Sequence, residues 1–92
     1  MDYSRYECLS AEREGKVLTV SFNRPQALNA INAQLHTELS HIFADIAQDH
    51  ETEAVVLTGK GRAFCAGGDI KWFQDMTSAQ LDDLFSEARK II

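Results

Sequence analysis

The stretch AVVLTGKGRAFCAGGDI, residues 54–70, joins a short apolar run to a glycine-rich loop. Four of the chain's five glycines lie in it, at Gly59, Gly61, Gly67 and Gly68. Glycine loses more conformational freedom on folding than other residues, so a cluster of glycines indicates positive φ or a close approach to the backbone. The first six residues, AVVLTG, are typical of a strand that is buried on both faces of a parallel sheet.

The glycine loop leads from this strand into GDIKWFQDM, residues 68–76, which the pattern predicts to be a short helix. Ligands of α/β proteins gather where strands end and helices begin, because the first amides of a helix have no partner within it. Two interpretations of Gly67 and Gly68 remain open, a tight turn or a backbone that a ligand oxygen can approach. A phosphate loop is disfavoured, because the string matches neither GxxxxGK[ST] nor GxGxxG.

Residues 6–22 predict a β-hairpin. The runs YECLSAERE and KVLTVSF surround a turn at Glu14 and Gly15. In the second run, Leu18, Val20 and Phe22 share one face, because side chains alternate along a strand. The only proline, Pro25, is expected to end this strand, because proline has no N–H to donate to the sheet.

The segment from Asn32 to His50 predicts an amphipathic helix. Asn32 suits the N-cap, where its side chain can accept a hydrogen bond from an unpaired amide of the first turn. The apolar positions recur with helical spacing at Leu35, Leu39, Ile42, Phe43 and Ile46. Because a strand precedes this helix and another follows it, we expect a parallel pair of strands with the helix packed back on the sheet.

A second helix is predicted from the capping box TSAQ, residues 77–80. Its apolar stripe consists of Leu81, Leu84, Phe85, Ala88, Ile91 and Ile92. The stripe reaches the last residue without a glycine cap. We therefore expect residues 1–92 to be the N-terminal part of a longer domain that is truncated after Ile92.

Composition restricts the partners. The chain has 92 residues and a formal net charge of −5, and its Lys and Arg residues are scattered, so nucleic acid and membrane are not expected as partners. The polar, acidic start is unlike a signal peptide, which favours a cytoplasmic location. Cys8 and Cys65 lack metal-ligand spacing and are expected to be structural, and no metal is expected. The histidines His36, His41 and His50 are expected on or beside the solvent-facing side of the first helix or at its end, without a chemical role.

Two motifs carry a family resemblance. RPQALNAI, residues 24–31, is followed after a helix and a strand by VVLTGKGRAFCAGGDIKWF, residues 55–73. Together they resemble the N-terminal part of the enoyl-CoA hydratase/isomerase family, the crotonase superfamily, over nearly the entire chain. The resemblance implies an α/β fold, the crotonase-like (ClpP/crotonase) spiral of ββα units, of which this chain would supply only the N-terminal part. It also implies a homo-oligomer, a trimer or a hexamer.

The resemblance further implies an acyl-CoA substrate in fatty-acid or branched-acid metabolism. Coenzyme A would be part of the substrate, and no prosthetic group would be needed. The backbone N–H of Gly68 would donate to the thioester oxygen in an oxyanion hole, which stabilises enolate charge. The residues implied to contact the substrate or its coenzyme A are Ala27, Leu28, Ala66, Gly68, Asp69, Ile70 and Lys71. Lys60 and Arg62 are alternatives to Lys71 for a phosphate contact, or all three are solvated loop charges.

The residues that complete catalysis in the family have no counterpart in this sequence. Its second oxyanion amide and its acid and base carboxylates lie downstream, and no motif places Glu38, Glu51 or Glu53 near a thioester. Hydratase therefore cannot be separated from isomerase, decarboxylase or hydrolase, and the 92-residue chain alone is expected to be inactive. The alternative is a non-catalytic, truncated crotonase-like module that acts in assembly or coenzyme A binding.

Overall fold

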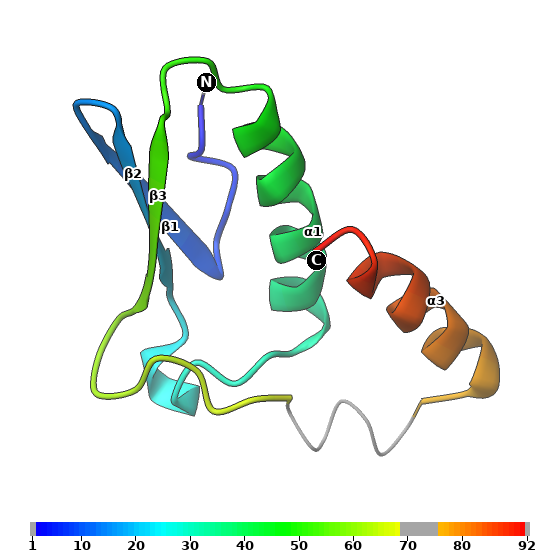
Figure 1. Cartoon of the computed structure of the whole chain (residues 1–92). Helices are drawn as coiled ribbons and strands as arrows, with labels where there is room; N and C mark the ends of the chain where they lie inside the picture. Colours follow the sequence, from blue (N-terminus) through cyan, green and yellow to red (C-terminus); the bar gives the residue numbers. More distant parts are fainter. Residues whose placement is uncertain (1, 69–75, 92) are drawn as a thin grey trace.

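A computed structural model describes residues 2–68 and 76–91. Its elements are two strands, β1 (Leu9–Glu14) and β2 (Val17–Phe22), a 3₁₀ turn, η1 (Pro25–Ala27), helix α1 (Ala33–Ala47), strand β3 (Ala54–Gly59) and helix α3 (Ser78–Ala88) (Figure 1). The short helix predicted over residues 68–76 lies outside the described residues except at its two ends.

The three strands form one sheet in the order β1-β2-β3. β1 and β2 are antiparallel, and the turn between them contains Gly15 at φ +63°, which confirms the predicted hairpin. β2 and β3 are parallel, with Val20 opposite Leu57. Parallel neighbours cannot be joined by a tight turn, and α1 supplies the long connection that this pairing needs.

The core lies between the sheet and α1, which runs alongside it (Figure 1). The Asn32 side chain accepts a hydrogen bond from the Leu35 amide at 2.9 Å, so the predicted N-cap is confirmed. The helix ends at Ala47, somewhat before the predicted end near His50. Leu18, Val20 and Phe22 of β2 are buried together with Leu35, Leu39 and Ile42 of α1, as the two periodicities predicted.

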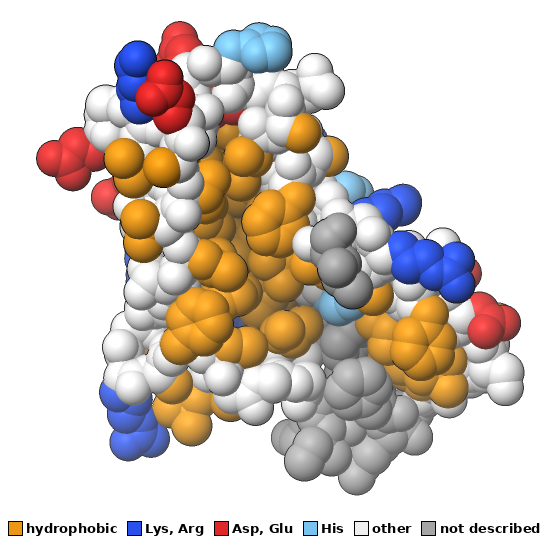
Figure 2. Space-filling model, viewed as in Figure 1, with side chains coloured by type: hydrophobic (Ala, Val, Ile, Leu, Met, Phe, Trp, Pro, Cys, Tyr) orange, Lys and Arg blue, Asp and Glu red, His pale blue; other side chains and the backbone are white. Residues whose placement is uncertain are grey.

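The prediction that β3 is buried on both faces is wrong for this chain. β3 is an edge strand, and Val55, Val56 and Leu57 are 41%, 48% and 40% exposed. Figure 2 shows a hollowed apolar surface that extends from β3 across to α1. The parallel pairing of β3 with β2 was predicted from the order strand, helix, strand and is confirmed, whereas burial of β3 requires neighbours that the described residues do not supply.

Helix α3 confirms the capping box but not the predicted length. The Thr77 hydroxyl accepts from the Gln80 amide, and the Gln80 side chain accepts from the Thr77 amide. The helix ends at Ala88, and Ile91 packs against the core from the turn that follows. The apolar stripe therefore does not continue as a helix to Ile92. No residue of α3 is buried, and Figure 1 shows the helix projecting away from the sheet.

Candidate functional site

Segment 24–31 of the first motif and the glycine loop of the second, residues 59–68, lie side by side although residues 32–58 separate them in the sequence. The Ala66 amide donates to the Leu28 carbonyl at 3.1 Å, and the Ile31 amide donates to the Gly67 carbonyl at 2.7 Å. Ile31 and Gly68 form an isolated parallel β-bridge. The structure therefore brings together the segments that the resemblance assigned to one substrate.

Asn29 joins the same two segments through its side chain and is completely buried. Its Oδ1 accepts from the Arg24 amide at 2.8 Å, and its Nδ2 donates to the carbonyls of Lys60 at 2.9 Å and Ala63 at 2.8 Å. Sequence reasoning missed Asn29 as an individual residue. The signal that could have found it is an asparagine in a loop, because asparagine tolerates the left-handed backbone (here φ +56°) and bonds nearby main chain.

The glycines of the loop serve different needs. A Cβ on Gly59 would lie 2.4 Å from the Phe64 carbonyl oxygen and 2.8 Å from Nδ2 of Asn29, so the atoms that approach this glycine belong to the protein. Gly67 has open space around its Cβ position but adopts φ +91°, which favours glycine. At these two positions the cluster is explained by loop packing and by a turn.

Gly68, the predicted oxyanion donor, is exposed. Among the described residues, the β-bridge between Ile31 and Gly68 is formed by the hydrogen bond from the Ile31 amide to the Gly67 carbonyl, which does not involve the Gly68 amide. Within residues 2–68 and 76–91, the Gly68 amide donates no hydrogen bond.

The other predicted contact residues divide into two groups. Ala27 ends η1, Leu28 is 37% exposed in the left-handed region at φ 53°, and Ala66 is exposed on the facing segment. Asp69, Ile70 and Lys71 lie outside the described residues and stay predictions. Lys60 and Arg62 are exposed.

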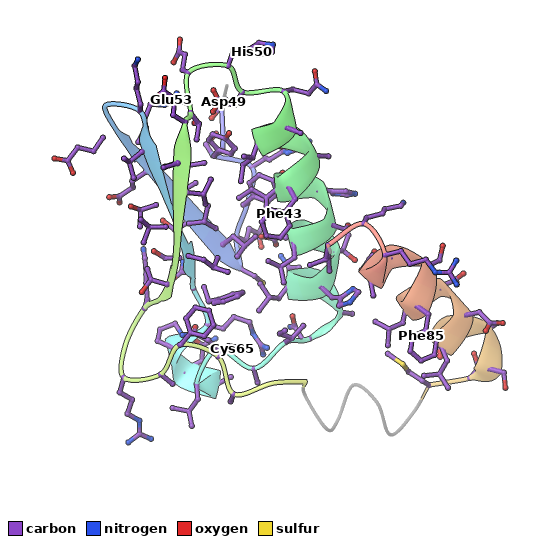
Figure 3. All side chains as sticks on the ribbon, in the orientation of Figure 1. Phe43, Asp49, His50, Glu53, Cys65 and Phe85 are labelled. Atoms are coloured by element: carbon purple, nitrogen blue, oxygen red, sulfur yellow. The ribbon has the colours of Figure 1, made fainter. Side chains whose placement is uncertain are left out.

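The carboxylates of Glu38, Glu51 and Glu53 have structural partners. Glu38 Oε1 accepts from the amides of Glu7, Cys8 and Leu9 at 3.0, 2.9 and 3.2 Å, which orders the chain entering β1. Glu51 pairs with Arg13 at 3.1 Å and Glu53 with Lys16 at 3.2 Å. Figure 3 shows Glu53 at the end of the molecule opposite Cys65 of the glycine loop.

The next residues to place are the histidines and the cysteines, for which no chemical role was predicted. His36 is less exposed than predicted, because its side chain, 12% exposed, contacts Glu87 of α3 at 2.5 Å. His41 and His50 are exposed. Burial raises the pKa of the Cys8 thiol, which makes it less reactive. In the described part of the chain, no cluster of side chains could hold a metal ion.

A hollow of about 460 Å³ lies between the N-terminal segment and the hairpin, lined by Tyr3, Tyr6 and Leu18 among others. Its lining contains no residue of the glycine loop.

Among the described residues, no helix combines the length and the apolar character that crossing a membrane requires.

The resemblance assigned segment 24–31 and the glycine loop to one substrate, and the structure places the two in contact. The sequence profile of the family Enoyl-CoA hydratase/isomerase matches residues 12–90. The chain therefore belongs to the enoyl-CoA hydratase/isomerase family, and its fold is part of the crotonase fold.

Individual relatives agree with this assignment. A probable enoyl-CoA hydratase of Mycobacterium tuberculosis is 40% identical over 74 residues, which cover 80% of this chain and 29% of the relative. The short-chain-enoyl-CoA hydratase of Clostridium acetobutylicum is 43% identical over 70 residues, 75% of this chain and 27% of the relative. The 1,2-epoxyphenylacetyl-CoA isomerase of Escherichia coli is 36% identical over 64 residues, 70% of this chain and 24% of the relative.

Solved structures show the same fold. The enoyl-CoA hydratase/isomerase of Mycobacterium paratuberculosis superposes with a TM-score of 0.84 at 29% identity, covering 91% of this chain and 34% of that one. The enoyl-CoA hydratase of Bacillus anthracis gives a TM-score of 0.81 at 32% identity, with coverages of 92% and 34%. The chain thus spans about a third of the length of these solved structures and 24–29% of the length of the relatives named above.

Proposed function

We propose that this chain forms the part of an enoyl-CoA hydratase/isomerase that binds an acyl-CoA thioester. In this proposal the backbone amide of Gly68 donates to the thioester oxygen. The observation that supports it is the contact between segments 24–31 and 59–68, at the end of which Gly68 is exposed and its amide has no acceptor among the described residues. Ala27, Leu28 and Ala66 on these segments, and Asp69, Ile70 and Lys71 beyond them, would contact the coenzyme A part of the substrate.

The chemistry follows from where charge develops. When a proton leaves the carbon beside the thioester, negative charge moves to the carbonyl oxygen as an enolate forms. One preorganised donor at such an oxygen lowers the barrier by about 2.7–4 kcal/mol. A backbone amide suits this role, because it is held by the main chain and needs little reorganisation when the charge appears. Acyl-CoA chemistry of this kind needs no prosthetic group.

Turnover requires more than the oxyanion donor. A general acid or base must lie beside the reacting carbons, and Glu38, Glu51 and Glu53 are engaged in structural contacts. We therefore propose binding without useful turnover for the 92-residue chain. A role in fatty-acid metabolism, a cytoplasmic location and a trimeric or hexameric assembly belong to the same proposal for the whole enzyme.

The test is a titration of the chain with butyryl-CoA, which has no double bond to react. Ligation at Cys65 allows a chain with N-methylglycine at position 68 to be assembled from two peptides. This change removes the Gly68 N–H but keeps the Gly67 carbonyl that accepts from Ile31. An unmodified chain made by the same ligation and a Gly68→Ala chain are the matched controls.

We expect both controls to bind butyryl-CoA and the N-methylglycine chain to bind at least tenfold more weakly, with unchanged circular dichroism. Equal affinity in all three chains would remove the oxyanion role of Gly68. Absence of binding by the unmodified chain would contradict the acyl-CoA proposal itself. Turnover of crotonyl-CoA by the pure chain would show that the missing carboxylates are not needed.

A further inference from the structure

We infer that Asn29 is a positioning residue that sets the direction of the Gly68 amide. The inference rests on the proposed function for that amide. The Asn29 side chain has no exposed surface and binds main-chain groups on both sides of the site, at Arg24 on one segment and at Lys60 and Ala63 on the other. It is therefore a side chain that fastens the glycine loop to the RPQALNAI segment.

The bonding of the Asn29 amide explains why asparagine is needed. Both hydrogens of Nδ2 are directed at carbonyl oxygens, at 2.9 and 2.8 Å, while Oδ1 accepts from the Arg24 amide at 2.8 Å. Aspartate has no hydrogens to donate at neutral pH and would place a charged oxygen against two carbonyl oxygens. An apolar residue would remove all three of these hydrogen bonds, which is costly where the groups cannot reach water.

The backbone of Asn29 adds a second requirement. Leu28 and Asn29 both adopt left-handed φ angles, 53° and 56°, so the chain turns sharply at this point. The turn directs the Leu28 carbonyl to the Ala66 amide and the Ile31 amide to the Gly67 carbonyl. These two hydrogen bonds flank Asn29 in the sequence and end one residue before Gly68.

The path from Asn29 to Gly68 is therefore short. The side chain holds the loop at Ala63, the main-chain bonds on either side hold it at Ala66 and Gly67, and Gly68 follows directly. Gly59 leaves the room for this junction, because a Cβ there would lie 2.8 Å from Nδ2 of Asn29. Loss of the side chain removes the bonds that hold the loop at Lys60 and Ala63, so we expect the main-chain bonds at Ala66 and Gly67 to weaken and the Gly68 amide to lose its fixed direction.

Two substitutions separate the side chain from the backbone. Asn29→Asp keeps the acceptor for Arg24 but removes the two donors, whereas Asn29→Gly removes the side chain and keeps easy access to positive φ. The matched control is Asn32→Ala, which removes the N-cap of α1 and destabilises the chain without touching the glycine loop. A general loss of stability is thus present in the control as well.

The readout is the thioester carbonyl of butyryl-CoA labelled with ¹³C at that carbon, observed by isotope-edited infrared difference spectroscopy. A donor at the oxygen lowers the stretching frequency, so we expect a downshift in the unmodified chain and in Asn32→Ala. In Asn29→Asp and Asn29→Gly the downshift should be lost. Hydrogen exchange at the Ala66 amide should become about tenfold faster in the Asn29 variants than in Asn32→Ala.

The outcomes distinguish the inference from the proposed function. A downshift that persists in folded Asn29 variants, or unchanged exchange at Ala66, overturns the positioning role and leaves the proposed function intact. Absence of a downshift in the unmodified chain overturns the proposed function, while faster exchange at Ala66 would still support the junction. Should both Asn29 variants fail to fold, Gly59→Ala disturbs the junction from the opposite side and should give the same two changes.

Discussion

At the scale of single residues, the Asp49 carboxylate shows how a charge is held within this small chain. Its side chain is 2% exposed and accepts from Tyr3 Oη at 2.7 Å, Arg13 Nη2 at 2.6 Å, Thr52 Oγ1 at 2.9 Å and the Glu51 amide at 3.1 Å. The hydrogen bond from Tyr3, with those from Arg13 and Thr52, holds the pKa of Asp49 well below its usual range, against the opposing effect of burial. Asp49 thereby ties the N-terminal segment and β1 to the end of α1.

This depressed pKa predicts a dependence of stability on pH. A carboxylate with a lowered pKa in the folded state contributes its stabilisation fully above the ordinary value of 3.8 and loses it as the pH falls further. We expect the free energy of unfolding to decline between about pH 5 and pH 2.5, and Asp49→Asn to be less stable at pH 7 with a shallower decline. Urea unfolding across this range measures both.

The exposed Asp83 of α3 provides the control, because Asp83→Asn should leave the slope unchanged. An equally steep decline in the Asp49→Asn chain would assign the pH dependence to other groups.

Single residues also mark the limit of sequence reasoning at the site. The glycine cluster was recognised as a close approach or a turn, because glycine has few other uses in such numbers. The structure assigned Gly59 to a close approach of protein atoms and Gly67 to a turn. The role of Asn29 could not be predicted, because two of its three partners lie more than thirty residues away.

At the scale of elements, α3 contacts α1 through the carboxylate of Glu87. The Glu87 carboxylate contacts His36 Nδ1 at 2.5 Å and accepts from Thr37 Oγ1 at 3.0 and 3.1 Å. Leu81 and Phe85 on the same helix are 37% and 60% exposed. A helix that buries no apolar side chain gains little from packing, so the Glu87 contacts carry much of its docking.

Removal of the Glu87 carboxylate should therefore act locally. We expect Glu87→Ala to reduce the global free energy of unfolding by no more than about 1 kcal/mol, because partly exposed polar contacts contribute little. Amide exchange within α3 should become faster, while exchange in β2 and the middle of α1 should not change. Hydrogen exchange read by mass spectrometry or NMR measures this, with Asp83→Ala as the control on the same helix. Unchanged exchange in α3 would show that other contacts hold the helix.

The boundaries of the helices show that capping residues predict where a helix begins, whereas an apolar stripe does not predict where it ends. The Asn32 N-cap and the Thr77 capping box were predicted correctly, because each depends on residues within one turn. The end of α3 was predicted wrongly. Its apolar stripe runs on in the sequence, but a stripe extends a helix only where a surface buries it.

At the scale of the whole molecule, the described residues leave an apolar surface exposed. Its exposed members on β3, the glycine loop and α3 are Val55, Val56, Leu57, Phe64, Leu81 and Phe85. Figure 2 shows hydrophobic side chains, in orange, gathered on the face between β3 and α1 and again on α3. Exposed apolar patches and exposed edge strands of this kind promote association.

We expect the chain to bind a dye such as ANS and to associate as its concentration rises. Val56→Lys should reduce the association and change the free energy of unfolding by no more than about 0.5 kcal/mol, because Val56 is 48% exposed. Val56→Ile, which keeps the surface apolar, should associate like the parent chain. Sedimentation velocity and urea unfolding measure the two quantities. A parent chain that stays monomeric at high concentration would contradict the prediction.

The sequence by itself determined the hairpin, the two helix starts, the parallel pairing of β3 and the family, because these depend on short-range spacing and on two local motifs. Only the tertiary structure decided that β3 is an exposed edge, that α3 docks through Glu87 and that Asn29 joins the two motif segments. The physical reason is the same in each case. Burial and hydrogen-bond partners are set by residues distant in the chain, and the period of a strand or helix specifies which face is apolar but not what covers it.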